Sequence, residues 1–544
     1  MTRIVGTCRA ALAAVLFLSL AAPALAGEES RDPGGNFDRD FSRTVPAKAG
    51  QKLEIEHSQG ALRIGTHALP EVRVRAKITV SSSDGEWAQK FGAGITITVE
   101  DVGSSIVVRT KYPEQGGLSF SGRGHVSYAV DMEITMPESM PLSARCKFGD
   151  VSVAGLKAPG TVVNANGQLA FSDGRGKQRL ENAFGSITVT KNVGDVDVSG
   201  SNGNVSATDV EGALTVRNRF GTVQARRTKG AVLINTSNGA VLLEDATNGN
   251  VTGSFGRVDV RNLSGSLEVQ NSNGEVSVQK VAGKTSVRNS FALVDLSDVG
   301  GPVEVENSNG GVRLRDAKGA ARIKTSFGEI DASNVPGDLT AVGDNGAVTL
   351  GNVGGTVDAR GSFGKITVSQ VKKGARIVGN NSAVSVADVS GGPVSVSTSF
   401  GFVEAARIDG DVKVDNSNGA VKVSGIKGGA RVSTSFAGAT VDGVGGAVDV
   451  DNQNGSVEVR GLPAGAKCAP VTIKSSFGPI RVFLPEGTGY DVSARTSFGK
   501  VSTQIPLTVS GSQSADAISG KIGDGKCTLT LEDTNGSIEI LKGR

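Results

Sequence analysis

Apolar and polar residues alternate in short segments over most of the chain. A typical stretch, FGRVDVRNL followed by SGSLEVQNS (residues 255–272), places two aliphatic residues at alternate positions shortly after each glycine. Alternate residues of a strand point to the same face, so each segment predicts a short strand with one buried and one exposed face. The glycine before each strand, often preceded by asparagine, indicates a tight corner, because both residues tolerate left-handed backbone.

These segments belong to an internal repeat. Phenylalanine followed by Gly or Ala recurs every 35 to 37 residues, at Phe148, Phe184, Phe220, Phe255, Phe291, Phe327, Phe363, Phe400 and Phe436. An asparagine follows each of them after 18 residues, at Asn166, Asn202, Asn238, Asn273, Asn309, Asn345, Asn381, Asn418 and Asn454. The unit is therefore 18 residues long and consists of two nonapeptides, with Phe and Asn alternating at its first position.

This repeat predicts an all-β fold, a parallel β-solenoid with rungs of about 18 residues, capped at both ends. A strand of three residues cannot bury its apolar face alone, whereas many strands stacked in register can. Eighteen residues give roughly 60 Å of contour, which suits a flat coil with two sheets about 10 Å apart. A 36-residue coil would enclose a space too wide for the available valines to fill at protein packing density.

The chain divides into five parts. Arg3 and Arg9, an apolar run and a small-residue site at Ala26 predict a secretory signal peptide over residues 1–26, with a short N-terminal membrane anchor as the alternative. The protein is therefore expected to be exported, to the periplasm or to the extracellular side of the cell surface. We then expect a polar lead-in (27–50), a β-rich N-terminal cap with the first rungs (51–145), the regular solenoid (146–465), and irregular C-terminal rungs with a second cap (466–544). No helix of consequence is expected.

Composition narrows the classes of function. Glycine contributes 76 of 544 residues, as a chain of many corners requires. The net charge is only +3, which argues against a nucleic-acid partner, since such proteins carry a basic surplus. The three histidines (His57, His67 and His125) all lie near the N-terminus and are interpreted as surface or cap residues.

Beyond the proposed leader the chain has three cysteines, Cys146, Cys468 and Cys527. An odd number leaves at least one of them unpaired within a monomer. Cys468 and Cys527 both lie in the irregular C-terminal part and are candidates for a bridge. The alternative is that all three are small buried apolar residues.

Residues 126–167, VSYAVDMEITMPESMPLSARCKFGDVSVAGLKAPGTVVNANG, together with the SFG and NSNG units that follow, resemble the DUF4097 family of exported bacterial β-strand-repeat adhesins. The resemblance covers most of the chain after the leader. It implies a β-solenoid, export and an adhesin-like role, and it supplies no catalytic residues.

Tests for chemistry-bearing motifs favour a protein without metal, cofactor or catalytic residues. The G-G-x-G-x-D corner of calcium-binding β-rolls and the G-x-S-x-G nucleophile motif are both absent from the sequence. Two acidic groups (Asp195, Asp197, Asp209 and Asp442, Asp449, Asp451) and one basic patch (Arg217, Arg219, Arg226, Arg227, Lys229) are interpreted as solvated faces. The alternatives are a carbohydrate-active carboxylate site and a contact for an anionic glycan or lipid headgroup.

The phenylalanine column supplies the candidate ligand-binding residues, Phe184, Phe220, Phe255, Phe291, Phe327, Phe363, Phe400 and Phe436. If the rings stay outside, they form an aromatic stripe with a spacing of about 10 Å, suited to sugar rings or to another apolar surface. The favoured interpretation is that each ring folds over the corner into the core, because nine exposed rings in line would promote aggregation.

The sequence thus predicts an exported, non-catalytic, adhesin-like β-solenoid that offers a rigid, repetitive surface for binding or spacing in the cell envelope. Its expected partners are envelope glycans or another envelope protein. Two other classes stay open: a carbohydrate-active β-helix enzyme, and a periplasmic accessory or envelope-stress component.

Overall fold

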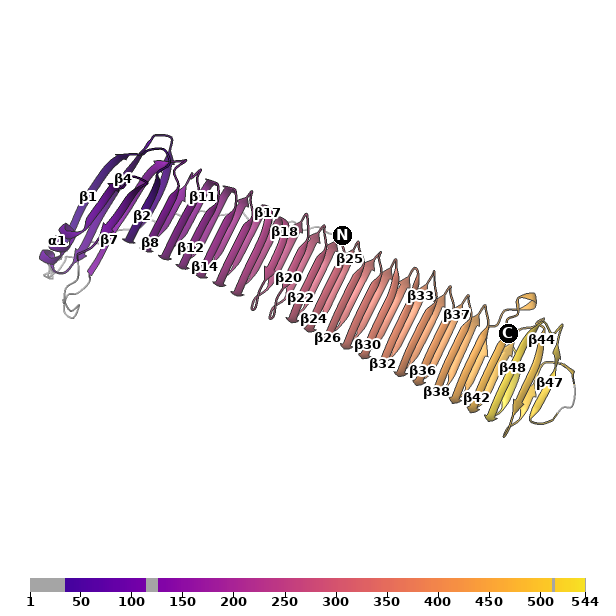
Figure 1. Ribbon diagram of the computed structural model, residues 1–544. Coiled ribbons are helices and arrows are strands. Elements are labelled where there is room, and N and C mark those ends of the chain that lie inside the picture. Colours follow the sequence, from indigo (N-terminus) through magenta and orange to yellow (C-terminus); the bar gives the residue numbers. More distant parts are fainter. Residues whose placement is uncertain (1–34, 114–125, 511–513, 544) are drawn as a thin grey trace, which may run out of the picture.

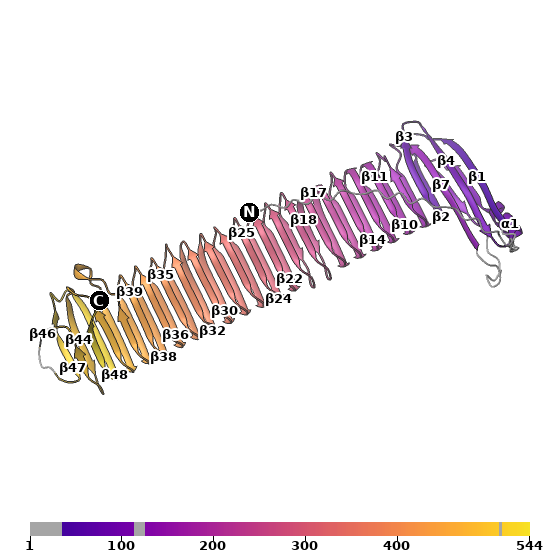
Figure 2. The same ribbon diagram turned by 180° about the vertical axis from the view of Figure 1, so that it is seen from behind.

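A computed structural model describes residues 35–113, 126–510 and 514–543 of the chain. These residues form one long rod of stacked strands, with the N-terminal and C-terminal parts at opposite ends (Figures 1 and 2). The expected signal peptide and His125 lie outside the described residues. Among the helices that the structure describes, none has the length and apolar character needed to cross a membrane.

Each rung of the rod contributes one short strand to each of two faces. Strands pair in parallel with the strand of the next rung, so that Val276 lies beside Val294 and Val294 beside Val312. Phe291 lies beside Asn309, which in turn lies beside Phe327. The parallel solenoid with 18-residue rungs is thereby confirmed, and the 36-residue coil is excluded.

The first face consists of β9 (Val151–Ala154), β11 (Leu169–Arg175), β13 (Ile187–Val193), β15 (Val205–Val210), β19 (Val258–Leu263), β21 (Val276–Val281), β23 (Val294–Val299), β25 (Val312–Ala317), β27 (Ile330–Val335), β29 (Val348–Val353), β31 (Ile366–Val371), β33 (Val384–Val389), β35 (Val403–Ile408), β37 (Val421–Ile426), β39 (Ala439–Val444), β41 (Val457–Arg460) and β43 (Ile480–Leu484). Two longer strands, β17 (Val223–Asn238) and β18 (Val241–Thr252), run through both faces.

The second face consists of β8 (Leu142–Phe148), β10 (Gly160–Asn166), β12 (Gln178–Phe184), β14 (Val196–Asn202), β16 (Leu214–Phe220), β20 (Leu267–Gln270), β22 (Thr285–Phe291), β24 (Val303–Asn309), β26 (Ala321–Phe327), β28 (Leu339–Asn345), β30 (Thr356–Phe363), β32 (Gly374–Asn381), β34 (Val394–Phe400), β36 (Val412–Asn418), β38 (Ala430–Phe436), β40 (Val448–Asn454) and β42 (Val471–Phe477). Most of these strands end at the Phe or Asn of the repeat.

The core is a continuous double layer of aliphatic side chains between the two faces. Val305, Leu314 and Ile323, from consecutive strands, are fully buried, and the same alternation runs through the whole stack. At the second corner the backbone enters the left-handed region at one residue per rung, for example at Asn262 and Asp298. Short polar side chains suit that conformation, which explains why Asp and Asn recur there.

The N-terminal end is closed by additional strands and one helix. On one face β1 (Gly35–Pro46), β4 (Glu71–Ser82) and β7 (Val126–Pro137) are antiparallel neighbours, and β7 pairs with β3 (Leu62–His67). On the other face β5 (Thr96–Asp101) pairs with β6 (Ser105–Lys111), which pairs with β2 (Lys52–Gln59). Part of the expected polar lead-in is thus the edge strand β1.

The expectation that the chain lacks a helix of consequence is wrong at this end, where α1 (Gly85–Gly94) packs against β1 and β4. Asp84 caps the helix by accepting a hydrogen bond from the Trp87 backbone N–H. The rings of Trp87 and Phe91, one turn apart, stack with centroids 4.6 Å apart. The helix is short and contains three glycines, so its apolar periodicity is too brief to indicate a helix from the sequence.

The C-terminal end reverses the chain order of its last rungs. The strands β44 (Tyr490–Thr496) and β45 (Val501–Thr503) form the outermost rung, although they precede β48 (Cys527–Asn535) and β49 (Ile538–Lys542) in the sequence. The final segment of the chain therefore inserts between β42–β43 and β44–β45. The antiparallel strands β46 (Thr508–Val509) and β47 (Ala517–Ile522) flank β44, and a short 3₁₀ helix, η1 (Gly465–Lys467), precedes β42.

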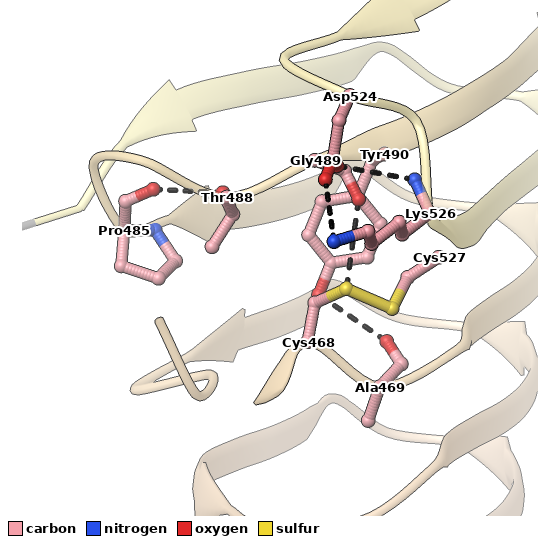
Figure 3. The surroundings of a disulfide bond; sticks show 9 residues. All are labelled: Cys468, Ala469, Pro485, Thr488, Gly489, Tyr490, Asp524, Lys526 and Cys527. Carbon is pink, nitrogen blue, oxygen red and sulfur yellow. Dashed lines mark hydrogen bonds and ion pairs between the residues drawn. A yellow bond between two sulfur atoms is a disulfide. The ribbon is translucent and has the colours of Figure 1, made fainter. Parts of the chain in front are cut away.

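A disulfide joins Cys468 to Cys527 and ties the segment before β42 to the start of β48 (Figure 3). The Tyr490 hydroxyl, buried beside it, donates a hydrogen bond to the Ala469 carbonyl at 3.2 Å. Of the two interpretations of the cysteines, bridging is confirmed for this pair. Cys146 is free and buried, and burial raises the pKa of its thiol to about 11.

The corner glycines leave room for nothing larger than hydrogen. A Cβ atom on Gly346 would lie 2.1 Å from the Gly328 carbonyl oxygen of the preceding rung. A Cβ atom on Gly351, five residues later on the same rung, would lie 3.6 Å from its nearest neighbour, the Ser369 hydroxyl. The two glycines therefore differ in steric tolerance while sharing their surroundings.

We expect Gly346→Ala to lower the free energy of unfolding by about 1–3 kcal/mol, because the rungs must separate to admit the methyl group. The matched control, Gly351→Ala, is expected to be neutral or stabilising by roughly 0.4–1 kcal/mol, because it restricts only the unfolded chain. Urea unfolding followed by circular dichroism measures both. Equal destabilisation by the two variants would contradict the close contact between rungs.

Candidate binding surface

The phenylalanine column lies on the outside of the rod. Its eight candidate rings are between 45% and 61% exposed, and seven of them end a strand. The residues are Phe184, Phe220, Phe255, Phe291, Phe327, Phe363, Phe400 and Phe436. They follow the edge formed by the arrowheads of β12, β22, β26 and β30 in Figure 1. The favoured expectation that these rings fold into the core is wrong.

The reason is that another side chain already fills the inside of this corner. The residue two positions before each Phe or Asn is a buried Asn, Thr or Ser in most rungs. The Asn289 amide group donates hydrogen bonds to the carbonyls of Phe291, at 2.6 Å, and of Gly274 in the preceding rung, at 3.2 Å. Thr325 makes the same contacts with Phe327 and Gly310. We call this series the inner polar ladder.

The asparagines between the rings are part of the scaffold. Asn166 donates a side-chain hydrogen bond to the Lys147 carbonyl at 3.2 Å, and Asn345 donates one to the Ser326 carbonyl at 3.2 Å. The asparagines thereby hold successive rungs together and separate the phenylalanines along the edge. Among the described residues, ring–ring contacts occur only in the N-terminal cap, so the faces of the column are not stacked on one another.

A shallow polar groove of about 540 Å³ runs beside the column. One side is a row of serines that each come one residue before the column, including Ser254, Ser272, Ser290, Ser308 and Ser326. The other side carries longer side chains, among which Arg288 and Glu306 form an ion pair at 3.4 Å. Hydroxyl groups and aromatic rings therefore lie side by side between residues 252 and 327. The sequence signal, a serine before most of the phenylalanines, is present but was not used in predicting the site.

Charges elsewhere on the rod are paired, which favours the solvated-face interpretation. Arg217 pairs with Asp197 at 2.9 Å, and Arg460 pairs with Asp442 at 3.0 Å. The Arg227 guanidinium, bonded to Asp209 at 2.6 Å, lowers the pKa of that carboxyl. The candidate acidic and basic groups are thus drawn into pairs with each other's charge type. Within the described ranges, no three His, Cys, Asp or Glu side chains are placed to hold a metal ion.

The two described histidines lie in the N-terminal cap, far along the chain from the column. His57 is buried, and its ring nitrogens lie 3.1 Å from the Thr110 hydroxyl and 3.2 Å from the Gly60 carbonyl. Burial lowers the pKa of His57, which favours the neutral ring. His67 contacts the Leu69 backbone N–H at 3.1 Å. Both contacts are structural, in keeping with their interpretation as cap residues.

Comparison with known proteins gives distant structural likenesses. No protein-family model matches this sequence, and no curated protein matches it. The chain is similar to the crystal structure of a candidate adhesin from Parabacteroides distasonis, with 14% identity, a TM-score of 0.19, and coverage of 54% of this chain and 97% of the other. A candidate cell adhesion protein from Clostridium sporogenes is similar at 10% identity, with a TM-score of 0.13 and coverage of 54% and 99%. A candidate adhesin from Parabacteroides merdae is similar at 9% identity, with a TM-score of 0.17 and coverage of 56% and 96%. Identities and TM-scores this low support no inference about function.

Asp533 occupies a position of the inner polar ladder where a hydrogen-bond donor is found in other rungs. Its neighbours in the adjoining rungs are Ser475 and Thr496, and neither carboxyl oxygen has a hydrogen-bond partner among the described side chains. The charged groups on the neighbouring outward positions are Lys474, Arg495 and Glu532. Burial raises the pKa of Asp533, which favours its protonated form.

Because the folded pKa is raised, Asp533 stabilises the fold below its unfolded pKa, near pH 4, and this stability is lost as pH rises through the folded value. We expect Asp533→Asn to be more stable than wild type at pH 7 by roughly 1 kcal/mol and equal to it near pH 4. Urea unfolding between pH 4 and 7 measures the difference. The exposed Asp451→Asn is the control, and the same pH profile in both variants would contradict this assignment.

Proposed function

We propose that this chain is an exported, non-catalytic, adhesin-like rod that binds a polymer of the cell envelope through its phenylalanine column. The observation that carries the proposal is a periodic row of half-exposed rings on a rigid edge, beside a row of hydroxyl groups. Exposed apolar side chains in a continuous row mark interaction surfaces more often than solvated ones. Aromatic faces beside polar groups suit sugar rings, whose faces carry C–H groups and whose edges carry hydroxyls.

Export is supported by the bridge between Cys468 and Cys527. Structural disulfides form and persist in oxidising compartments such as the periplasm and the cell surface. Together with the expected signal peptide, this bridge favours a location outside the cytoplasm. Among the two expected kinds of partner, the hydroxyl-lined groove favours an envelope glycan over another envelope protein.

The repetition of the column has a consequence for affinity. Rings at equal intervals along a rigid rod engage a repeating polymer at several points without any change of shape. Each further contact is then intramolecular, so the overall affinity exceeds that of one contact by a large factor. A weak interaction between one ring and one sugar is sufficient for firm attachment.

We expect Phe255→Ser/Phe291→Ser/Phe327→Ser to weaken binding of the exported protein to the insoluble envelope fraction by roughly 100-fold, since each stacked ring contributes about 1 kcal/mol. The matched control, with Trp at the same three positions, keeps the aromatic faces and should bind as wild type does. Sedimentation with isolated envelopes measures both, and circular dichroism verifies the fold. Undiminished binding by a folded serine variant would refute the proposal.

A further inference from the structure

The column repeats at an interval of two rungs. Phe255 lies beside Asn273, Asn273 beside Phe291, and the same alternation continues through Asn309 to Phe327. Neighbouring strands are about 4.8 Å apart, so the rings recur about every 10 Å along the rod axis. A ligand that contacts several rings in the same way must therefore have a repeat close to this interval.

The surface on both sides of the column is charge-balanced. On the side of the groove Arg288 pairs with Glu306 at 3.4 Å, and on the other side Arg257 approaches Glu275 at 3.9 Å. A polyanion would require a surplus of positive charge, and this stretch offers none of substance. Charge complementarity therefore indicates a neutral ligand.

The polar groups beside the rings indicate hydroxyl chemistry. The serines of the groove, such as Ser272, Ser290 and Ser308, present one hydroxyl per rung next to the column. A wholly apolar protein partner would cover these hydroxyls without replacing their bonds to water, at a cost in free energy for each. A chain of sugars supplies both the hydroxyls for the groove and the C–H faces for the rings.

We propose that the surface between Phe255 and Phe327 binds an extended, neutral, 1,4-β-linked glycan lying parallel to the rod axis. In such a chain successive sugars are rotated by about half a turn, so equivalent faces recur every second sugar. That two-sugar repeat is close to the two-rung interval of the rings, and alternate sugars then stack on Phe255, Phe291 and Phe327. The sugars between them lie over Asn273 and Asn309. This inference rests on the proposed function and names its ligand class.

The experiment uses the full chain, expressed with its own N-terminal segment and purified after export. Cellohexaose and chitohexaose are the 1,4-β-linked probes. Maltohexaose and laminarihexaose contain the same sugar as cellohexaose with linkages that give other repeats. We expect calorimetry to show at least tenfold tighter binding of the two 1,4-β-linked probes.

A variant that moves one ring tests the interval itself. Phe291→Asn/Asn309→Phe keeps the composition and the exposed apolar area of the column, and both residue types already occupy its positions. The interval between rings changes from two rungs to three and one. We expect this variant to lose at least tenfold in affinity for cellohexaose or chitohexaose while circular dichroism stays unchanged.

The outcomes separate this inference from the proposed function. Equal affinity for all four probes, or full affinity in the ring-moving variant, overturns the 1,4-β-linked assignment even where the serine variant still loses envelope binding. Dimerisation of the wild type that the serine substitutions abolish would assign the column to a second copy and also overturns it. If the serine variant keeps its envelope binding, the proposed function itself fails.

Discussion

The contact between consecutive corners is the constraint on which the rest of this structure depends. Each corner glycine lies against the backbone of the rung before it, as Gly274 does against the Gly256 carbonyl, with no space for a side chain between them. Parallel pairing across 18 residues then follows, since any other period would bring a side chain to the place of a glycine. The apolar alternation of the strands fills the interior only when this register is kept.

The same corner decides what the rod shows to its surroundings. The inner polar ladder satisfies carbonyl groups where the backbone turns, and its Asn and Thr side chains occupy the space inside. The phenylalanine two residues later has no interior to enter and stays on the edge. A requirement of hydrogen bonding at the corner therefore produces an exposed aromatic column with the period of two rungs, and this column is the basis of the proposed binding function.

The repeat itself contains most of the fold. Spacing and alternation were sufficient to predict the parallel solenoid, the rung length and the alternation of Phe with Asn along one edge. The position of the rings was predicted wrongly, because the pattern does not reveal that a buried polar residue such as Asn289 fills the corner first. The helix at Gly85–Gly94 and the insertion of β48 and β49 before the last rung arise at the ends, where the repeat gives no guidance. For the cysteines, the sequence could name the pair but not decide whether it was bridged, since the bridge depends on that insertion.

The most direct test of the stacked-rung account is to remove whole rungs and measure the length of the rod. Deleting residues 310–345 removes two rungs and joins Asn309 to Gly346, which restores the same corner. The account predicts a folded protein whose maximum dimension in small-angle X-ray scattering is shorter by about 10 Å. Deleting residues 310–336 instead removes one and a half rungs and should disrupt the fold, because strands then meet corners. An unfolded product from the first deletion, or a folded rod of normal stability from the second, would contradict the account.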